Sequence, residues 1–338
     1  MQLGYWMQFW WMSPVALSIC VTANTLGVSG AALFLPFYTL VFPLLGHHLQ
    51  PVQAVEVGIM TEIFGFMSST TAFWRAGLID FRIAGFAVLF AAPMAVLGGY
   101  ASHFVPAQWM LAIIGVGLMG LSGLMFRKGG HARSDVPAAQ ALGKANAVRQ
   151  DPAEANGLKQ HVDRQGRIYR YRVLNDLWRG AAASIGGIFH GLVGFSAGEL
   201  STVEQVFRGM PVRMASGNSH LIIAAASIAA AFTHLGVSAV QGTKVPWNIL
   251  AITIPTVLVG GQLAALVAGR LPQHRLRIIL SCVLLFLGAI SLYRASASSH
   301  VHLRGWTPFV LSVGVPLVWF LLRRRARSSA QTTCRAMA

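Results

Sequence analysis

The sequence predicts an all-α protein that crosses a membrane several times, built from two inverted repeats with a broken or re-entrant helix at the start of each, plus one extra C-terminal helix. Composition is the first reason: of 338 residues, 55% are hydrophobic and only 11% are charged. A soluble domain of this length could not cover so much apolar surface. A series of apolar segments of membrane-spanning length is the second reason, and a set of landmarks that occurs twice is the third.

The apolar segments set the expected helices. Each is long enough for a helix to cross a hydrocarbon core of roughly 30 Å. Two further segments, 6–45 and 177–207, are interrupted by glycine and serine and are expected to be broken or paired elements. The last uninterrupted segment has no counterpart in the other half. The uninterrupted helices are expected near 54–73, 82–103, 107–126, 214–235, 247–268, 276–293 and 305–322.

The landmarks occur in the same order about 160 residues apart. Each copy has a glycine-serine break, then a Pro-Val pair, then a proline followed by a glycine pair, then another proline. Duplicated membrane units whose corresponding segments are interrupted at glycine are typical of secondary transporters, which hold their substrate where the two copies meet. The corresponding positions are Gly27–Gly30 and Gly194–Gly198, Pro51 and Pro211, Pro93 with Gly98-Gly99 and Pro255 with Gly260-Gly261, and Pro106 and Pro272.

The N-terminal segment lacks the basic region and the Ala-x-Ala site of a cleaved signal peptide, so we expect it to be retained. Trp6, Trp10 and Trp11 are expected to anchor it at the membrane interface. Three scattered cysteines have no spacing typical of a metal site or a disulfide framework. They are expected to be packing residues.

A polar stretch with 11 Lys and Arg residues separates the two halves. Its start, Lys128 to Glu154, is expected to be flexible, whereas Arg164 to Arg172 alternates like the arm of a small hairpin. We therefore divide the chain into a first transmembrane repeat (1–126), a basic cytoplasmic loop (127–179), a second transmembrane repeat (180–294), and an extra transmembrane helix with a basic cytoplasmic tail (295–338).

The distribution of basic residues predicts the orientation. If 177–207 crosses the membrane once, the two sides carry 16 and 10 of the 26 Lys and Arg residues; if it enters and returns, or crosses twice, they carry 23 and 3. The positive-inside rule favours the second arrangement, with the long loop and the C-terminus in the cytoplasm of a bacterial inner (plasma) membrane. The loop before Pro51 is then external and the loop before Pro211 cytoplasmic, so the two copies are inverted.

The net charge of +16 has a bearing on partners. In a soluble protein it would suggest nucleic acid, but here the basic residues lie between apolar segments, and no basic face alternates with stacking aromatic residues. We expect no nucleic-acid partner. The expected partners are membrane lipid and a small anionic substrate, and the sequence allows a homodimer.

Met12–Arg127 and Gly180–Arg294 resemble the TauE/SafE (TSUP) family of sulfite and organosulfonate exporters. The resemblance implies a duplicated membrane module that transports small, mainly sulfur-containing anions, such as sulfite or a sulfonate like sulfoacetate. The motifs that carry it are Gly27-Val28-Ser29-Gly30 with Pro36, Arg75 to Asp80, Pro93 with Gly98-Gly99, Gly194-Phe195-Ser196-Ala197-Gly198, Gly209 to Ser219, Trp247, and Pro255 with Gly260-Gly261.

The two breaks are the candidate substrate site. A glycine-rich break in a membrane helix frees backbone N–H groups, and the helix that resumes points its positive dipole end into the protein. Ser29 and Ser196 add hydroxyl donors beside Gly30 and Gly198, so an anion could be held without a buried basic side chain. Close helix packing is the alternative reason for glycine at these positions.

Polar residues after Pro211 extend this candidate site. Ser216, Ser219 and His220 share one helical face, with Asn218 beside them. Such residues in an apolar membrane helix face a cavity or a neighbouring helix rather than lipid. We predict Asn218 and Ser219 as substrate contacts, and hydrogen bonding between helices is an equal alternative for Ser216.

Acidic residues in apolar segments are the candidates for proton coupling. Glu62 lies deep in a predicted span and Glu199 lies directly on the second break, so each requires a partner, a proton or water. Glu204 can pair with Arg208 at i, i+4, and a position near a helix start accounts for Glu56. A role in proton relay is open for two histidines, but hydrogen-bonded packing is the more frequent role of a single histidine in a helix. These are His190 and His234.

A secondary transporter working by alternating access, with proton coupling, is thus the leading prediction. No enzyme activity, catalytic residue, cofactor or metal is expected. Gly194-x-Ser196-x-Gly198 matches a hydrolase serine motif, but that motif requires a strand-turn-helix, and the apolar flanks here predict helix on both sides. An intramembrane serine hydrolase is therefore the remote alternative. An anion channel without coupling is the nearer one.

Overall fold

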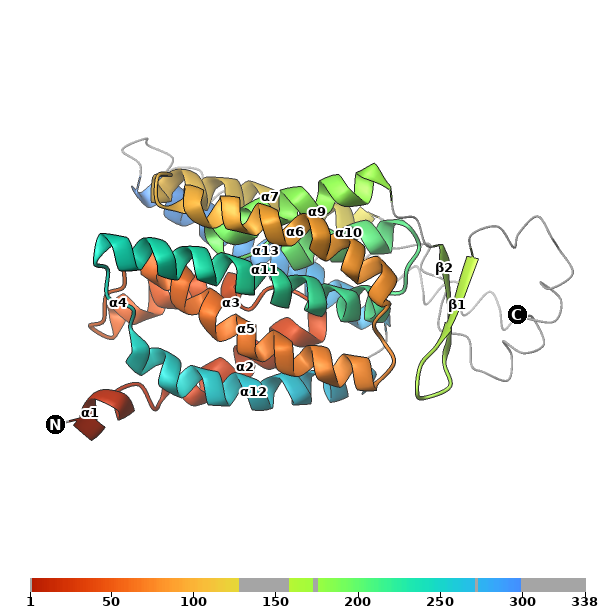
Figure 1. Ribbon diagram of the computed structural model, residues 1–338, viewed down its shortest axis with the longest axis horizontal. Coiled ribbons are helices and arrows are strands. Elements are labelled where there is room, and N and C mark those ends of the chain that lie inside the picture. Colours follow the sequence, from red (N-terminus) through yellow and green to blue (C-terminus); the bar gives the residue numbers. More distant parts are fainter. Residues whose placement is uncertain (1, 128–157, 173–175, 271–272, 299–338) are drawn as a thin grey trace, which may run out of the picture.

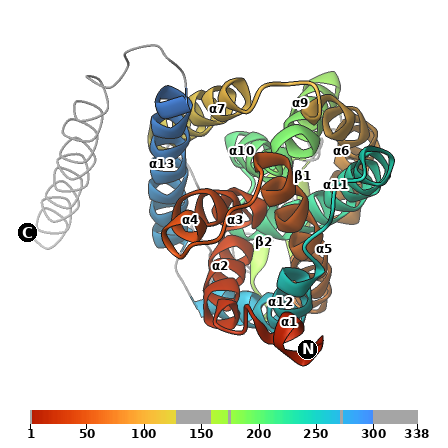
Figure 2. The same ribbon diagram turned by 90° about the vertical axis from the view of Figure 1, so that its left-hand side faces the viewer.

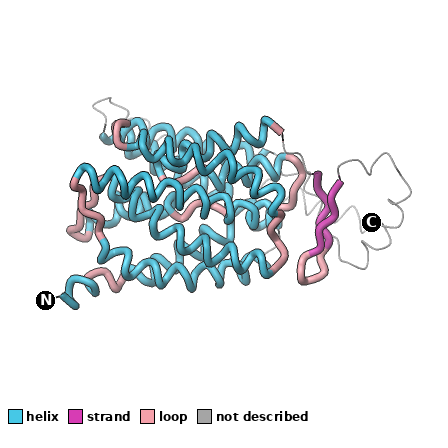
Figure 3. The backbone as a smooth tube through the Cα atoms, in the orientation of Figure 1, coloured by secondary structure: helices cyan, strands magenta, loops and turns pink. Residues whose placement is uncertain are grey.

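The computed structural model describes residues 2–127, 158–172, 176–270 and 273–298. Long helices lie side by side along one direction, and a two-stranded β-hairpin lies beyond one end of the bundle (Figure 1, Figure 3). The predicted helix at 305–322, the C-terminal tail and the start of the long loop lie outside the described residues.

The elements follow the predicted segments closely. The helices are α1 (Gln2–Met7), α2 (Met12–Leu26), α3 (Ala31–Pro36), the π-helix η1 (Phe37–Val41), α4 (Phe42–Leu44), α5 (Pro51–Arg75), α6 (Phe81–Ser102), α7 (Ala107–Arg127), α9 (Leu177–Val193), α10 (Ala197–Phe207), α11 (Val212–Gln241), α12 (Trp247–Arg270) and α13 (Gln273–Ser298), and the strands are β1 (Leu158–Val162) and β2 (Ile168–Arg172).

Three of these helices are individually long and apolar enough to cross a membrane: α6, α11, and α12 over Trp247–Ala268. The prediction of an all-α polytopic membrane protein is confirmed. Local sequence explains several boundaries: proline occupies the first turn of α5, and the Asp80 carboxylate caps α6 by accepting the N–H of Arg82 at 3.1 Å. Helix α11 continues beyond its predicted end, up to Gly242 at φ 68°.

Both segments that contain a break enter the bundle and return. In the first, Phe9 before α2 stacks on Phe42 of α4, with ring centroids 5.5 Å apart. In the second, Asp176 at the start of α9 accepts a hydrogen bond from Arg208, just after α10, at 2.8 Å. Each segment therefore begins and ends at the same end of the bundle, and we call it a re-entrant pair. Its returning helix is short, with 11 residues in α10 and six in α3.

The two re-entrant pairs open at opposite ends of the bundle. The end that we call the N-terminal end holds the start of α5 beside the end of α11, where Gln53 donates to the Lys244 carbonyl at 3.0 Å. The other end, called the hairpin end, holds the start of α11 beside the end of α5, where Asn218 accepts the N–H of Asp80 at 2.7 Å. Helices α5 and α11 therefore run antiparallel, as Figure 1 shows.

The glycine pairs of α6 and α12 are packing positions. At Gly98 a Cβ would lie 2.0 Å from a carbonyl oxygen of α9, and at Gly260 it would lie 2.9 Å from Cys20 of α2. The following glycines, Gly99 and Gly261, lie in the same way against α11 and α5. A side chain at Gly98, Gly260 or Gly261 would clash with the neighbouring helix, and at Gly99 it would be tight. Gly98 and Gly260 thus set the spacing of α6 and α12 on α9 and α2, the helices that lead to the breaks.

The long loop contributes the β-hairpin. Strands β1 and β2 pair antiparallel, with Leu158 opposite Arg172 and Val162 opposite Ile168. The predicted hairpin arm, Arg164 to Arg172, contains β2. Its first residues belong to the turn, which spans 163–167, and β1 lies before the predicted arm. Tyr169 and Tyr171 are 2% exposed and pack with residues of α5 and α11, so the hairpin docks firmly on its end of the bundle.

Viewed along the bundle, α3 and α10 lie near its centre, and the longer helices surround them (Figure 2). These are the two short helices that resume after the breaks. The fold thus brings both breaks into the interior, away from lipid.

Candidate functional site

The two breaks meet directly in the bundle interior. The Ser29 hydroxyl donates to the Gly194 carbonyl at 2.7 Å, and the Thr202 hydroxyl donates to the Gly27 carbonyl at 3.4 Å. Gly27 and Gly194 end α2 and α9 at φ 71° and 80°, a backbone region in which glycine is least strained. A Cβ at Gly27 would also lie 2.6 Å from the Ser216 hydroxyl. Glycine is therefore required by both conformation and space at the first break.

Glu199 joins the two breaks through its carboxylate. Oε1 accepts the N–H of Ser29 at 2.9 Å, and Oε2 accepts the N–H of Ser196 at 2.9 Å. Ser196 and Glu199 form a reciprocal capping box at the start of α10. Glu199 is 1% exposed, and these two backbone N–H groups are hydrogen-bond donors to its carboxylate.

Ser196 has an unusual backbone conformation. Its φ of 105° is the only positive value among the non-glycine residues that the structure describes. Conformations of this kind are strained by roughly 1–3 kcal/mol and persist where surrounding contacts enforce them. Here the capping box holds Ser196 in this conformation, which directs its N–H at the Glu199 carboxylate.

Glu62 provides a second carboxylate at the same centre. Oε2 accepts the N–H of Ala31 at 2.6 Å, so Glu62 occupies the first helical N–H of α3. Oε2 also contacts the Ser29 hydroxyl, whose single proton is shared between this carboxylate and the Gly194 carbonyl. Oε1 accepts the Ser227 hydroxyl at 2.6 Å. Glu62 is 2% exposed.

The basic group beside Glu62 is His190 of α9. Its Nε2 lies 2.8 Å from the Ser227 hydroxyl and 3.3 Å from Oε1 of Glu62. Because the Ser227 proton is directed at Glu62, the hydroxyl oxygen accepts from His190, which places a proton on Nε2. Ser227 was not singled out from the sequence, because it lies among alanine and isoleucine residues in the middle of α11 and an isolated serine there gives no signal of its own.

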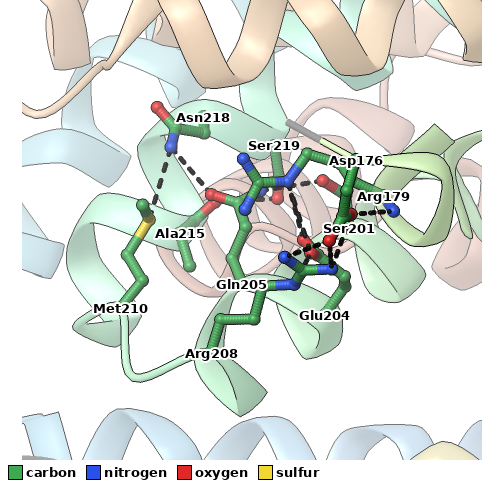
Figure 4. Close-up of polar contacts among 10 residues, drawn as sticks. All are labelled: Asp176, Arg179, Ser201, Glu204, Gln205, Arg208, Met210, Ala215, Asn218 and Ser219. Atoms are coloured by element: carbon green, nitrogen blue, oxygen red, sulfur yellow. Dashed lines mark hydrogen bonds and ion pairs between the residues drawn. The ribbon is translucent and has the colours of Figure 1, made fainter. Parts of the chain in front are cut away.

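The structure separates the two residues predicted to extend the site. Ser219 lies beside the breaks: its hydroxyl is 2.6 Å from the Thr202 hydroxyl and 3.3 Å from the Gly198 carbonyl. Asn218 faces away from them, towards the hairpin end, where it donates to Gln205 at 2.7 Å and contacts Met210 (Figure 4). Asn218 also accepts from Asp80, so all its contacts in the structure join helices to one another.

An ion-pair cluster closes the open side of the second re-entrant pair (Figure 4). The predicted pair of Glu204 and Arg208 is present at 2.5 Å, and Arg179 pairs with the same carboxylate at 3.2 Å. Hydrogen bonds from Arg208 hold the pKa of Asp176 below its usual value. This cluster fixes the end of α10 to the start of α9.

Asp80 connects the hairpin to the bundle. It accepts from the Lys159 ammonium and from the Tyr171 hydroxyl, both at 2.7 Å. Burial opposes its ionisation, but these hydrogen bonds, the charge of Lys159 and the Arg82 N–H together lower the pKa of Asp80. Burial and the Asp80 carboxylate raise the pKa of Tyr171. The hairpin is thus docked through an ionised Asp80.

Glu56 differs from its predicted role. It lies past the first turn of α5 and is completely buried, so the dipole at the start of that helix does not account for it.

Trp6 and Trp10 are 45% and 64% exposed, in keeping with an interfacial anchor, whereas Trp11 packs against aromatic residues after the first break. Among the described residues, no group of three or more His, Cys, Asp and Glu could hold a metal ion.

Fold and site together define a polytopic all-α membrane protein in which two re-entrant helix pairs join at a buried polar centre. Residues 13–291 match the family model described as Sulfite exporter TauE/SafE. The chain belongs to this family of membrane permeases, as its motifs indicated. No curated protein and no solved structure matches the chain.

Proposed function

We propose that the protein moves a small anion, namely sulfite, a sulfonate such as sulfoacetate or a related sulfur oxyanion, by alternating access coupled to protons. The observation that carries this proposal is the contact of the two breaks through the Glu199 carboxylate, which binds one N–H group from each. Amide groups that bind one oxyanion inside a membrane protein are suited to bind another.

The substrate position follows from these contacts. The N–H groups of Ser29 and Ser196 and the Ser29 hydroxyl form a set of convergent donors. The adjacent Gly30 is buried beside Glu62, and Gly198 packs against Ile223 of α11. Glu62 and Glu199 occupy these donors in the present structure. An incoming anion therefore has to displace a carboxylate.

That competition supports proton coupling. A carboxylate that leaves its amide donors inside the bundle loses charge-assisted hydrogen bonds worth about 1.5–3 kcal/mol each. Protonation removes the charge that makes the displaced group costly to bury and also removes its repulsion of the anion. In our proposal Glu62 and Glu199 take up protons as the anion binds, and give them up as it leaves.

Alternating access is supported by the opposite orientation of the two re-entrant pairs. We propose that they are the cores of two inverted repeats and that movement of one against the other exposes the shared centre first to one side and then to the other. The hairpin end carries Arg75, Lys159, Arg179 and Arg208, which supports a cytoplasmic location for that end. Cysteines placed at Ser29 and Ser196 should be labelled from opposite sides; labelling of both from one side alone would contradict the mechanism.

An anion channel is the second candidate, because convergent donors also suit a selectivity filter. Flux that neither saturates nor responds to a proton gradient would favour it. A serine hydrolase is less well supported. Ser29 contacts Glu62 and a carbonyl, and the imidazole at this centre, His190, lies against Ser227 instead.

The test combines binding and flux. Purified protein is screened for thermal stabilisation by sulfite, sulfoacetate, sulfate and acetate, because a ligand stabilises the state that binds it. The anion that stabilises most is then assayed in proteoliposomes with and without a pH gradient. We expect a sulfur oxyanion to stabilise and its flux to saturate and to depend on the gradient. Stabilisation by acetate alone would overturn the assignment of the substrate class.

A further inference from the structure

Three histidines lie between Glu62 and the N-terminal end of the bundle. They come from three different elements: His190 is on α9, His234 is on α11, and His103 follows α6 directly. His190 and His234 are fully buried, whereas His103 is partly exposed. The series therefore runs from the buried centre to a position near the surface of the bundle.

The inner step is a direct connection to Glu62. The Nε2 of His190 contacts the Ser227 hydroxyl at 2.8 Å, and that hydroxyl donates to Glu62 at 2.6 Å. The Nδ1 of His190 has no hydrogen-bond partner within the described ranges. His190 thus offers one nitrogen to Glu62 and leaves the other available to receive a proton.

The outer steps connect His190 to the end of the bundle. His234 donates from Nε2 to the carbonyl of Gly191, the residue next to His190, at 2.9 Å. The His234 and His103 rings lie 5.4 Å apart between centroids, and Gln241 at the end of α11 bonds to His103. Nδ1 of His234 and Nε2 of His103 are likewise buried atoms with no partner in the part of the chain that the structure describes. A ring nitrogen is therefore free at each of the three positions.

Packing alone does not account for this arrangement. A buried imidazole nitrogen without a hydrogen bond is unfavourable by about 1–3 kcal/mol, and three such atoms occur here in succession. His220 also has a buried ring nitrogen, Nε2, without a hydrogen bond to any residue that the structure describes, so the feature that distinguishes the three histidines is their succession and not the unpaired nitrogen itself. The His220 ring lies between Phe66 and Phe73, with centroids 5.1 and 4.2 Å away, and its Nδ1 contacts the Ser216 carbonyl of its own helix. His220 is held as a packing residue, with no histidine neighbour among its ring contacts.

We propose that His103, His234 and His190 form a proton route between the N-terminal end of the bundle and Glu62. The inference rests on the proposed proton coupling and adds to it the side from which the proton comes and the residues that carry it. Imidazole is suited to this role because it can accept a proton on one nitrogen and release one from the other near neutral pH.

The last transfer can be written with all protons placed. A proton passes from His234 to Nδ1 of His190 through a water molecule, because the Gly191 carbonyl that His234 contacts cannot itself carry a proton. The proton on Nε2 of His190 then passes to the Ser227 oxygen. The Ser227 hydroxyl gives its own proton to Oε1 of Glu62, which becomes a neutral carboxylic acid. His190 is left neutral with its proton on Nδ1, and a change of tautomer restores the starting state.

Several titratable groups face these residues. Glu62 faces His190 of α9, Glu199 of α10 and the Cys20 thiol of α2. His190 also faces Glu199, and His234 faces both other histidines. Glu62 and Glu199 thus lie at the inner end of the route, where they attract the proton. A third carboxylate, Glu56 of α5, lies beside Ser238 of α11, one turn beyond His234, so the outer part of the route also has an acidic neighbour.

The test separates proton movement from anion binding. Wild type, His103→Gln, His234→Gln and the control His220→Gln are reconstituted into phosphatidylethanolamine/phosphatidylglycerol vesicles that contain a pH-sensitive dye. The His234→Gln variant keeps an N–H donor for the Gly191 carbonyl, and monodispersity and thermal unfolding are checked for every variant. Proton movement driven by a sulfite gradient is measured beside the exchange of labelled sulfite at equal pH.

We expect both route variants to lose proton movement by about tenfold or more, since proton transfer by a positioned group contributes at least this much. Binding of sulfite at fixed pH, followed by the stabilisation that sulfite gives each variant against thermal unfolding, should stay within about twofold of wild type, because these rings lie apart from the anion donors. Sulfite exchange should fall together with proton movement, since Glu62 takes up and releases a proton in each cycle. His220→Gln should keep both activities. Wild-type proton movement in the two route variants would overturn the route and leave proton coupling intact. Sulfite exchange without proton movement in the wild type would overturn the coupling as well.

Discussion

Replacement of Glu199 by alanine is expected to tighten the binding of sulfite. In the wild type the anion has to displace a carboxylate that holds two N–H groups, each at 2.9 Å. One hydrogen bond to a charged group contributes about 1.5–3 kcal/mol. If sulfite binds the variant without breaking one such bond, its affinity for the variant is about 10- to 150-fold higher than for the wild type. The empty protein should be less stable, because two buried N–H groups lose their acceptor.

The assay is a titration of the purified protein with sulfite at fixed pH, followed by thermal unfolding with and without sulfite. Glu199→Ala should unfold at a lower temperature alone and regain more stability with sulfite than the wild type does. Ser201→Ala is the matched control, since Ser201 lies on the same short helix and bonds to Gln205 rather than to a break. Unchanged or weaker sulfite binding in Glu199→Ala would refute the idea that the carboxylate occupies the anion position.

Three further outcomes are expected. Gly191→Ala should abolish stable folding, because a Cβ there would lie 2.0 Å from the Ala95 carbonyl and 2.5 Å from a second backbone atom. The control Gly85→Ala adds a Cβ that has nothing within 4 Å, and in detergent it should unfold within a few degrees of the wild type. Docking of the β-hairpin should be complete at neutral pH. It should weaken as the pH falls below 3.8, the usual pKa of aspartate, and through the lowered pKa of Asp80. Hydrogen exchange in the hairpin measures this, and exchange that does not change with pH would contradict it. Lys159→Ala should increase hairpin exchange at neutral pH by no more than about tenfold, since the lysine is half exposed and such pairs contribute roughly 0.2–1 kcal/mol; exchange as fast as in an undocked hairpin would show that the tyrosines do not hold it.

The elements could be predicted largely from the sequence because apolar length and glycine carry strong local signals. Both breaks are visible as glycine and serine in an apolar segment, and Glu62 and Glu199 are visible as acids where acids are rare. What the sequence could not show is that both carboxylates meet at the first break and that Glu199 joins it to the second. That contact joins residues up to 170 positions apart, and no local pattern reports it.

Asn218 is a second case in which the sequence did not predict what a side chain contacts. Helical periodicity correctly groups Ser216, Ser219 and His220 on one face, but it does not identify what that face contacts. Asn218 points towards Asp80 and Gln205 because the α5–α6 turn packs closely against α11, with the position of a Gly217 Cβ only 2.3 Å from the Leu78 carbonyl. The role of a polar residue in a membrane helix depends on this packing between distant segments.

The shared Glu199 carboxylate has a consequence for biogenesis. The Ser29 N–H belongs to the half that is synthesised first, yet its acceptor belongs to the half that is synthesised second. An unsatisfied N–H is unfavourable in hydrocarbon. Until α10 is synthesised, the first half is therefore incompletely folded, with its break either hydrated or outside the bundle interior. Only when the ribosome has delivered α10 can the interior close, and a chain that stops before it should be removed by quality-control proteases.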